Sequence, residues 1–398
     1  MTKRCIIIGA GASYGYNSKL IDSERPPLGR DVLFRAKEKG ILTKEKFSHM
    51  FSTLLDYCDK NQKDKSDFSD VDIEEYLEYM ALELEHINST LNESITQPSP
   101  EEIEKITRII QGDFKGLWKT ISESYKKEDD PHYKIRAVAN GFQSALGESW
   151  FLMFELFRYY SIAYSPMFDA YRRLALHHLD EEYDLISLNY DIIFELAANV
   201  SGIVVAYPDI SPDKFLMTSS RIIRMAKVHG SINWFNSLGR AIALSGVNDS
   251  SYGLLNKIAG FIYSNRFHVG SPLIVDPNRL GQITMFNLLQ SGTDYYEPAL
   301  LPPVGGYKDY EKVQYFVRNW NEAEKMVSGA DELVFIGTQV RKQDTKLREL
   351  LKEKAKNNID ITVVGSKPTD QDLRDLMGNK SEKTPKRYPD FEHFVQTF

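Results

Sequence analysis

The 398-residue chain has only two cysteines, Cys5 and Cys58. Two thiols cannot build a disulfide framework or a four-cysteine zinc site, and such low cysteine use is typical of the reducing cytosol. No apolar run approaches the roughly 20 residues that a membrane-spanning helix needs. The first residues lead directly into a short apolar run, without the charged lead and long apolar core of a signal peptide. We therefore expect a cytoplasmic protein that contacts no membrane.

An excess of basic residues is also missing, since the formal net charge is −7 and the pI is near 5.7. Negative bulk charge opposes the phosphates of nucleic acids, so we expect no direct nucleic-acid binding. The basic stretch Lys380–Arg387 is interpreted as a solvated loop. Nor does the sequence show the clustered acidic triad of a metal-dependent nuclease, and His177-His178 lacks the neighbours of a metal site. We therefore expect no bound metal.

The most informative stretch is Lys3–Tyr16, which reads KRCIIIGAGASYGY. Its apolar run, Cys5–Ile8, is typical of a buried strand in a parallel sheet. The small residues of Gly9–Ser13 would let the backbone approach a pyrophosphate, and a following helix would direct its positive end there. The full dinucleotide fingerprint needs a third glycine where Tyr14 stands. The alternative interpretation is therefore a strand–turn–helix whose small residues serve packing.

The rest of the chain divides by its hydrophobic periodicity. Helical spacing dominates from about residue 42 to residue 180, as in Phe47–Cys58 and Ile73–Leu84. Beyond that segment, the predicted strands are Asp184–Leu188, Gly202–Tyr207, Met225–Val228, Pro272–Val275, Glu332–Ile336 and Asp360–Val364. Strands that alternate with helices predict a parallel sheet. We expect an α/β fold: a Rossmann-like domain from residues 1–40 and 181–398, interrupted by an inserted helical subdomain, residues 41–180.

Four predicted strands are followed by polar or glycine-rich sequences. These are Gly9–Ser13 (GAGAS), Asn189–Asp191 within SLNYD, His229–Ser231 (HGS) and Gly337–Thr338 within IGT, the last followed by Asp344. Ligands of open α/β sheets bind beyond the carboxyl ends of the strands. We therefore expect these four motifs to meet in one crevice.

Plainer roles exist for several of these residues. Asn189 could cap the helix predicted at Ile192–Ala198, because asparagine is a favoured N-cap. His229 could be a structural histidine at a strand end. Arg30 and Arg35 follow the proline-containing loop over the crevice, where they are either cations near a phosphate or solvated helix residues.

Together, GAGAS, SLNYD, HGS and IGT resemble the sirtuin family in their order along the chain. Sirtuins carry GAG-x-S, then Gln-Asn-x-Asp, then His-Gly, then Gly-Thr-Ser, and the match covers the first motif and most of residues 183–398. This chain has Leu188 in place of the glutamine, Gln339 in place of the last serine, and too few cysteines for the zinc module of deacetylating sirtuins. It looks most like the zinc-free, sirtuin-like NAD-hydrolysing proteins of bacterial anti-phage defence, in particular the subunit paired with a HerA-type ATPase.

The resemblance implies an NAD glycohydrolase that releases nicotinamide and ADP-ribose and needs no cofactor beyond its substrate NAD. It implies that Asn189 orients the attacking water, that His229 is the general base, and that Asp191 holds either the ribose hydroxyls or Asn189. Residues that would cradle the diphosphate or line the adenosine side are Gly9, Ala10, Gly11, Ser13, Gly337 and Thr338, with Arg30 nearby. An amide that both donates and accepts, beside a histidine that titrates near neutral pH, suits this chemistry.

Control of this activity is expected, because unrestrained NAD hydrolysis would be toxic to the host. Control would come from homo-oligomerisation through the inserted helices or from a HerA-type ATPase partner. The alternative function is a non-catalytic subunit of a defence complex that binds NAD or ADP-ribose as a regulatory ligand. The pair Asn189 and His229 argues against it, because binding alone needs no base at the ribose. The missing zinc module argues against a protein deacylase.

Overall fold

A seven-stranded sheet forms the centre of the molecule. The computed structural model describes residues 2–17, 19–93, 114–124, 131–163, 169–178, 180–208, 221–237, 296–301, 314–380 and 383–398, with single residues between 100 and 112 and between 273 and 280. In spatial order the strands are β10 (Lys386–Tyr388), β9 (Asp360–Val364), β8 (Glu332–Ile336), β1 (Arg4–Ile8), β2 (Tyr183–Ser187), β4 (Ile222–Lys227) and β3 (Val204–Ala206). All of these neighbours pair in parallel, which confirms the expected Rossmann-like α/β fold.

The predicted strand at Cys5–Ile8 is the middle of this sheet. Its side chains are at most 1% exposed. Such a continuous apolar run is expected where helices cover both faces of a parallel sheet. Ile8 lies opposite Ser187 of β2 and opposite Ile336 of β8. The segments that follow these three strands therefore leave the sheet side by side, at the same edge.

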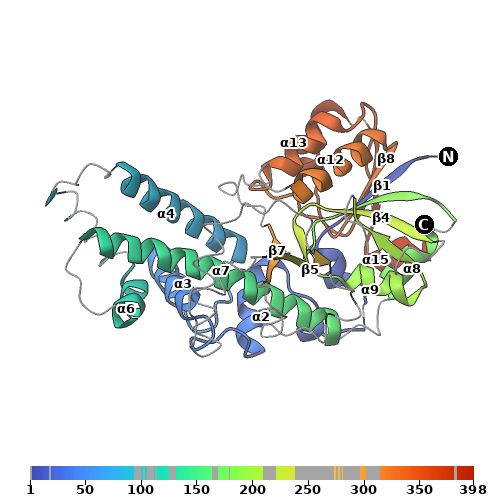
Figure 1. The fold of residues 1–398 in the computed structure, drawn as a ribbon. Helices are drawn as coiled ribbons and strands as arrows, with labels where there is room; N and C mark the ends of the chain where they lie inside the picture. The colour runs from blue at the N-terminus through green and yellow to red at the C-terminus, as the bar shows by residue number, and fades with distance from the viewer. Residues whose placement is uncertain are drawn as a thin grey trace.

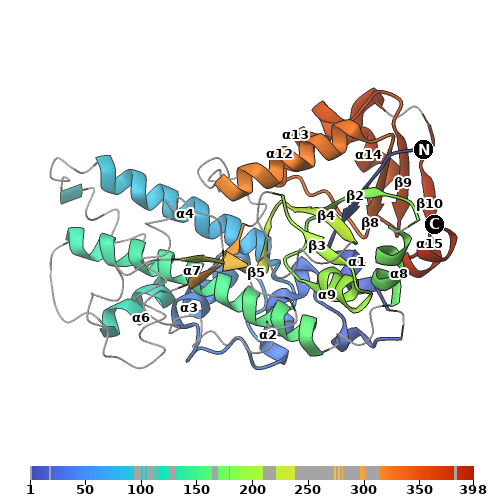
Figure 2. The ribbon, with the colours of Figure 1, turned by 45° about the vertical axis from the view of Figure 1, so that its right-hand side comes forward.

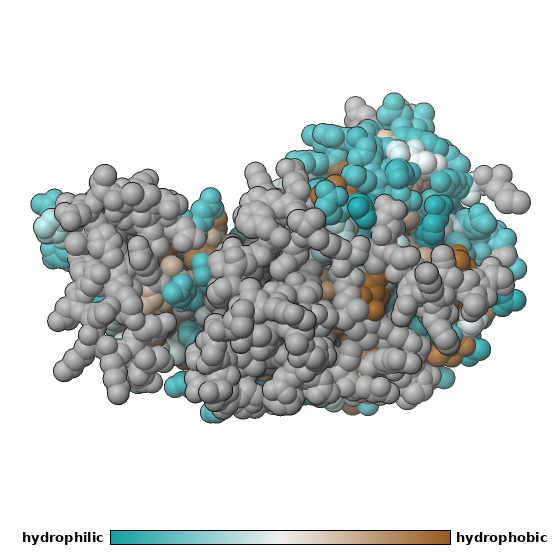
Figure 3. All heavy atoms as spheres, in the orientation of Figure 1, coloured by the Kyte–Doolittle hydropathy of each residue, from teal (hydrophilic) through white to brown (hydrophobic). Residues whose placement is uncertain are grey.

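Helices cover both faces of the sheet (Figures 1 and 2). One face carries α12 (Gln314–Gly329), α13 (Thr345–Lys354) and α14 (Asp370–Met377). The other carries α1 (Ala10–Gly15), α8 (Asp169–His177), α9 (Ile193–Val200) and α15 (Phe391–Thr397). The outer surface of α12 and α13 is hydrophilic (Figure 3), because their apolar side chains face the sheet.

The segment between β1 and β2 is largely helical, as its periodicity predicts. Beside the sheet domain lie α2 (Val32–Glu38), α3 (Ser48–Asn61), α4 (Ile73–Glu93), α6 (Lys115–Ser124) and α7 (Pro131–Ala163) (Figure 1). Single 3₁₀ turns cover Asp22–Glu24, Gly29–Asp31 and Gly378–Lys380. Aromatic rings of this segment pack against one another. The rings of Phe114 and Phe142, for example, meet edge to face with their centroids 4.8 Å apart. The division into residues 1–40 with 181–398 and residues 41–180 stays a prediction. Although α8 lies within residues 41–180, it packs on α9 and α15 of the sheet domain.

Two sequence expectations were wrong in part: the strand expected at Pro272–Val275 is present at Leu273–Ile274 but in another sheet, and the loop expected at Lys380–Arg387 ends in a strand. Of Pro272–Val275, the described pair Leu273–Ile274 (β6) belongs to a separate antiparallel sheet with β5 (Gly230–Ser237) and β7 (Tyr296–Leu300). Lys380–Arg387 is not simply a solvated loop, because Lys386–Tyr388 forms the edge strand β10. A short edge strand rich in charge carries no apolar signal, because only one of its sides is paired.

Candidate functional site

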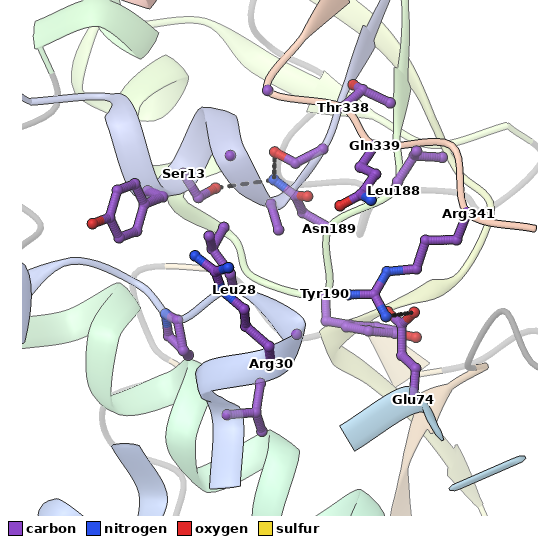
Figure 4. A pocket seen from close by; sticks show the side chains of 18 of the residues that line it. Ser13, Leu28, Arg30, Glu74, Leu188, Asn189, Tyr190, Thr338, Gln339 and Arg341 are labelled. Atoms are coloured by element: carbon purple, nitrogen blue, oxygen red, sulfur yellow. Dashed lines mark hydrogen bonds and ion pairs between the residues drawn. The ribbon is translucent and has the colours of Figure 1, made fainter. Parts of the chain in front are cut away.

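A pocket of about 550 Å³ lies beyond the carboxyl ends of the central strands (Figure 4). This volume suits a small molecule or a cofactor. Apart from Arg35, the pocket is lined by the residues that the sequence marks for catalysis or binding: Gly9, Ala10, Gly11, Ser13, Arg30, Asn189, Asp191, His229, Gly337 and Thr338. The four motifs therefore meet in one crevice. The roles assigned to the individual residues stay predictions.

The glycine turn after β1 crosses the turn after β8 at very short distance. The Gly9 N–H donates to the Ile336 carbonyl at 3.0 Å, and the Gly11 N–H donates to the Gly337 carbonyl at 2.9 Å. A Cβ on Gly11 would lie 2.8 Å from the Gly337 oxygen. The crossing therefore accounts for these glycines without any ligand. The crossing also occupies the Gly11 N–H, which can then not donate to an anion. The helix α1 has only six residues. The expected anion cradle therefore has fewer free donors than the motif implied.

Replacing Gly337 with alanine should strongly destabilise the fold. Its φ is +55°, and an added Cβ would lie 2.0 Å from the Ala12 nitrogen. A left-handed backbone costs a non-glycine residue about 1–2 kcal/mol, and the clash adds to this, so we expect a loss of about 3 kcal/mol or more in the free energy of unfolding. The matched control is Gly40→Ala, because Gly40 has φ +65° with open space around it. Equal losses in denaturant unfolding of the two variants would contradict the crossing.

The side chain of Asn189 is buried and oriented by two acceptors (Figure 4). Its Nδ2 donates to the Gly9 carbonyl at 3.1 Å and to the Ser13 Oγ at 3.0 Å. A backbone carbonyl only accepts, so the amide nitrogen must face Gly9. The other amide atom, Oδ1, has no hydrogen-bond partner among the described residues. The alternative role of Asn189 as a helix cap is wrong, because α9 begins at Ile193 and its N-cap position is Ile192. Asn189 instead holds an open acceptor at the pocket.

Ser13 and Asp191 line the pocket with Asn189. Besides Asn189, the Ser13 hydroxyl contacts the Tyr171 hydroxyl at 2.9 Å. The Asp191 Oδ1 also accepts from the Ile193 N–H at 3.0 Å. Burial raises the pKa of Asp191 above its ordinary value, whereas the Lys227 ammonium and this hydrogen bond lower it. Both roles expected for Asp191, holding the ribose hydroxyls or Asn189, stay predictions.

His229 forms a buried pair with Asp344. The His229 Nε2 lies 3.1 Å from the Asp344 Oδ2, and His229 is only 2% exposed. The other carboxylate oxygen of Asp344 accepts from the Leu347 N–H at 3.2 Å, which makes Asp344 the N-cap of α13. A carboxylate accepts, so Nε2 carries a hydrogen, and Nδ1 has no hydrogen-bond partner among the residues that the structure describes. This arrangement supplies a proton acceptor whose orientation is fixed.

Arg30 and Thr338 line the pocket in different ways. The Arg30 side chain is 74% exposed, and its Nε forms a long ion pair of 3.8 Å with the Asp31 Oδ1. The guanidinium therefore remains available to an anionic ligand (Figure 4). The Thr338 hydroxyl donates to the carbonyls of Ile7 and Ile336, so its proton is used inside the sheet. The expectation for Arg35 was wrong on both alternatives. It is buried, binds Asp22 and Glu38, and does not line the pocket.

One charged cluster of the pocket was missed by the sequence analysis. Arg341, four residues after Gly337, lies 2.9 Å from the Asp72 Oδ2 and 2.9 Å from the Glu74 Oε2 (Figure 4). Both acids lie at the start of α4, in the helical segment, so the cluster joins that segment to the sheet domain. The one sequence feature that could have pointed to Arg341 is its position shortly after the strand β8. Glu74 had none, because helical periodicity does not reveal which distant loop a polar residue meets.

Glu74 should make folding stability depend on pH. Burial raises its pKa from 4.5 to about 7. The folded protein therefore holds this proton more tightly than the unfolded chain, and the stability it contributes is complete below pH 4.5 and lost as pH rises through about 7. We expect wild type to lose up to about 3 kcal/mol relative to Glu74→Gln between about pH 5 and pH 8. Glu75→Gln, at the exposed neighbour, serves as the control. A difference that stays constant across denaturant unfolding at these pH values would refute the titration.

Within the residues described above, no group of three or more His, Cys, Asp or Glu side chains is placed to hold a metal ion. None of the helices that the structure describes has the length and apolar character needed to cross a membrane.

Comparisons with known proteins add a weak likeness of fold. No family profile and no curated protein matches the chain. One similar solved structure is described as the structural basis for the mechanism and regulation of Sir2 enzymes; it is 11% identical, covers 71% of this chain and 84% of its own, and has a TM-score of 0.31. Another, Sir2Tm bound to a propionylated peptide, is 13% identical, covers 61% and 76%, and has a TM-score of 0.30. Such scores are too low to guide the assignment of an activity.

Proposed function

We propose that this protein is an NAD glycohydrolase that cleaves NAD to nicotinamide and ADP-ribose. The observation that carries the proposal is the Asn189 Oδ1, a buried acceptor that has no partner among the described residues and whose amide is held at the pocket by two anchored N–H groups. A buried acceptor of this kind is costly unless a ligand or water donates to it. His229 lines the same pocket, and its Nδ1 likewise has no partner within the described part of the chain. An acceptor and an oriented base that line one pocket suit the activation of a water molecule.

The reaction needs little covalent chemistry from the protein. The bond between the ribose carbon and the pyridinium nitrogen breaks, and its electron pair neutralises the nicotinamide that leaves. The ribose carbon passes through an oxocarbenium-like state, as in other glycoside cleavages. Water adds to that carbon while one of its hydrogens binds the Asn189 Oδ1 and the other passes to the His229 Nδ1. Positioning and electrostatic stabilisation therefore supply most of the catalysis.

The rest of the pocket fits the remainder of NAD. Arg30 is a largely exposed guanidinium near the glycine turns and would bind the diphosphate. The apolar part of the wall includes Leu28, Leu77, Met153 and Phe157, which suits flat rings. No zinc and no cofactor besides the substrate take part in this proposal.

The biological setting follows from the resemblance of the motifs. We propose a cytoplasmic enzyme of anti-phage defence that depletes NAD, is held in check by homo-oligomerisation, and acts beside a HerA-type ATPase. Light scattering that finds a fully active monomer would oppose the control by assembly.

The test is a product balance. The purified chain is incubated with NAD in the absence of any acylated peptide, and nicotinamide and ADP-ribose are quantified by chromatography. The proposal predicts one nicotinamide and one ADP-ribose for each NAD consumed. Saturable NAD binding without turnover, both alone and with the ATPase added, would favour the regulatory subunit instead. Turnover that requires an acylated peptide would favour a deacylase.

A further inference from the structure

Lys227 is a fully buried ammonium that the proposed chemistry leaves without a role. It ends β4, two residues before His229, and is 0% exposed. Its Nζ donates to the backbone carbonyl of Asp191 and, at 2.8 Å, to the Glu195 Oε1. The same carboxylate oxygen accepts from the Tyr207 hydroxyl at 2.9 Å. A buried ion pair is weak evidence for a role in stability, because apolar replacements are often as stable. Stability alone therefore does not explain why Lys227 and Glu195 lie next to the site residues.

The partner that Lys227 holds belongs to the Asn189–Asp191 loop. The ammonium binds the carbonyl of Asp191 and also attracts the carboxylate of the same residue. Tyr190, between the two site residues, accepts from the Ile232 N–H at 2.9 Å. The loop is therefore tied on one side to the end of β4 and on the other to the start of β5. Its position decides where the Asn189 side chain leaves the backbone.

The Ser13 hydroxyl links the Asn189 amide to its surroundings. Its Oγ accepts from the Asn189 Nδ2 at 3.0 Å and shares a hydrogen bond with the Tyr171 hydroxyl at 2.9 Å, in which either oxygen can donate. Burial raises the pKa of the nearby Asp191 carboxyl, and the charge of Lys227 opposes that rise. Lys227 therefore acts on the Asn189–Asp191 loop by a hydrogen bond to its backbone and by its charge.

We propose that Lys227 is a positioning residue, which fixes the Asn189–Asp191 loop through its hydrogen bond to the Asp191 carbonyl, so that the Asn189 carbonyl stays aimed into the pocket. Lys227 acts through these residues and does not touch the substrate. Its catalytic consequence rests on the proposed function, whereas its effect on the Asn189 geometry does not.

Within the described residues, the charged and titratable groups around Asp191 come from three elements. Lys227 of β4 favours the carboxylate, and Glu195 of α9 opposes it. Tyr171 of α8 lies within electrostatic reach. Lys227 is the cation in this set, so its removal should make Asp191 easier to protonate.

The test uses a double variant that keeps the core neutral. Lys227→Met alone leaves Glu195 buried without a counter-charge and endangers folding, so it is combined with Glu195→Gln, whose amide oxygen still accepts from Tyr207. Glu195→Gln alone, which keeps Lys227 on the Asp191 carbonyl, is the control. We expect kcat for NAD to fall about 10–100-fold in the double variant, with KM nearly unchanged and the acidic limb of the pH profile moved to higher pH. A purely structural lysine would lower thermal stability without moving that limb.

Crystal structures of both variants give a readout that needs no turnover. In Glu195→Gln, the Asn189 Nδ2 should remain within hydrogen-bond distance of the Gly9 carbonyl and the Ser13 Oγ; in the double variant it should lose at least one of them. A folded double variant with the wild-type Asn189 geometry and pH profile would overturn the inference. Failure of the wild type to hydrolyse NAD would refute the proposed function alone, because the two crystal structures still decide the role of Lys227.

Discussion

Replacing Asn189 with alanine should abolish nearly all NAD turnover and leave NAD binding nearly intact. The Asn189 Oδ1 is the buried acceptor that we assign to the attacking water, and alanine offers no substitute for it. Loss of one preorganised polar group of this kind typically costs 10²–10³ in kcat, so we expect a decrease of about 10³-fold. Since the group acts on water, the Kd for NAD should change by less than about threefold. Nicotinamide release and calorimetry measure the two quantities.

The matched control for this change is Asn199→Ala, ten residues along the same chain segment. Asn199 lies near the end of α9 and does not line the pocket. Its replacement should leave kcat and Kd within about twofold of wild type, as surface substitutions away from a site usually do. If Asn189→Ala lowered binding and kept kcat, the residue would serve ligand recognition, and the water-orienting role would be wrong.

Replacing His229 with alanine should lower kcat by about 10²–10⁴-fold, the range that a general base usually contributes. Asp344→Asn should also lower it, by about 10²-fold, although the histidine remains. An asparagine amide at this position can donate to Nε2, which favours the ring form that carries its hydrogen on Nδ1. That form has no lone pair where the water is expected to lose its proton. Steady-state kinetics of both variants test the pair.

The chain offers a control pair of the same chemistry on its surface. The His393 Nδ1 lies 2.8 Å from the Asp390 Oδ2, and the His393 side chain is 65% exposed. His393→Ala should therefore leave kcat unchanged. An active His229→Ala variant would remove the general base from the mechanism and leave His229 as the structural histidine of a strand end.

The sequence predicts the sheet and the meeting of its motifs for one physical reason. Strands buried on both faces leave long apolar runs, such as Cys5–Ile8 and Glu332–Ile336, which need no knowledge of their neighbours. Once these runs are parallel, the residues that follow them must share one edge. The position of Asn189 beside Gly9 was therefore accessible from the sequence, although the two lie 180 residues apart.

The remaining features depend on contacts that local patterns do not encode. The direction of the Asn189 amide is set by one carbonyl of another strand end. The Arg341 ion pairs join a strand-end loop to a helix start 269 residues away in sequence, and charge alone does not select that partner. Nothing in the local sequence KVHG indicates that Lys227 is buried, because its burial depends on the Glu195 carboxylate beside it. Such residues are identified only when the packing is known.

The most direct test of the site is a crystal structure of the wild-type protein with ADP-ribose bound. The proposed mechanism predicts that the anomeric hydroxyl, which marks the position of the attacking water, donates to the Asn189 Oδ1 and faces the His229 Nδ1. It also predicts that the diphosphate contacts Arg30. An anomeric carbon remote from Asn189, or an Asn189 amide turned so that its oxygen faces Gly9, would contradict the mechanism.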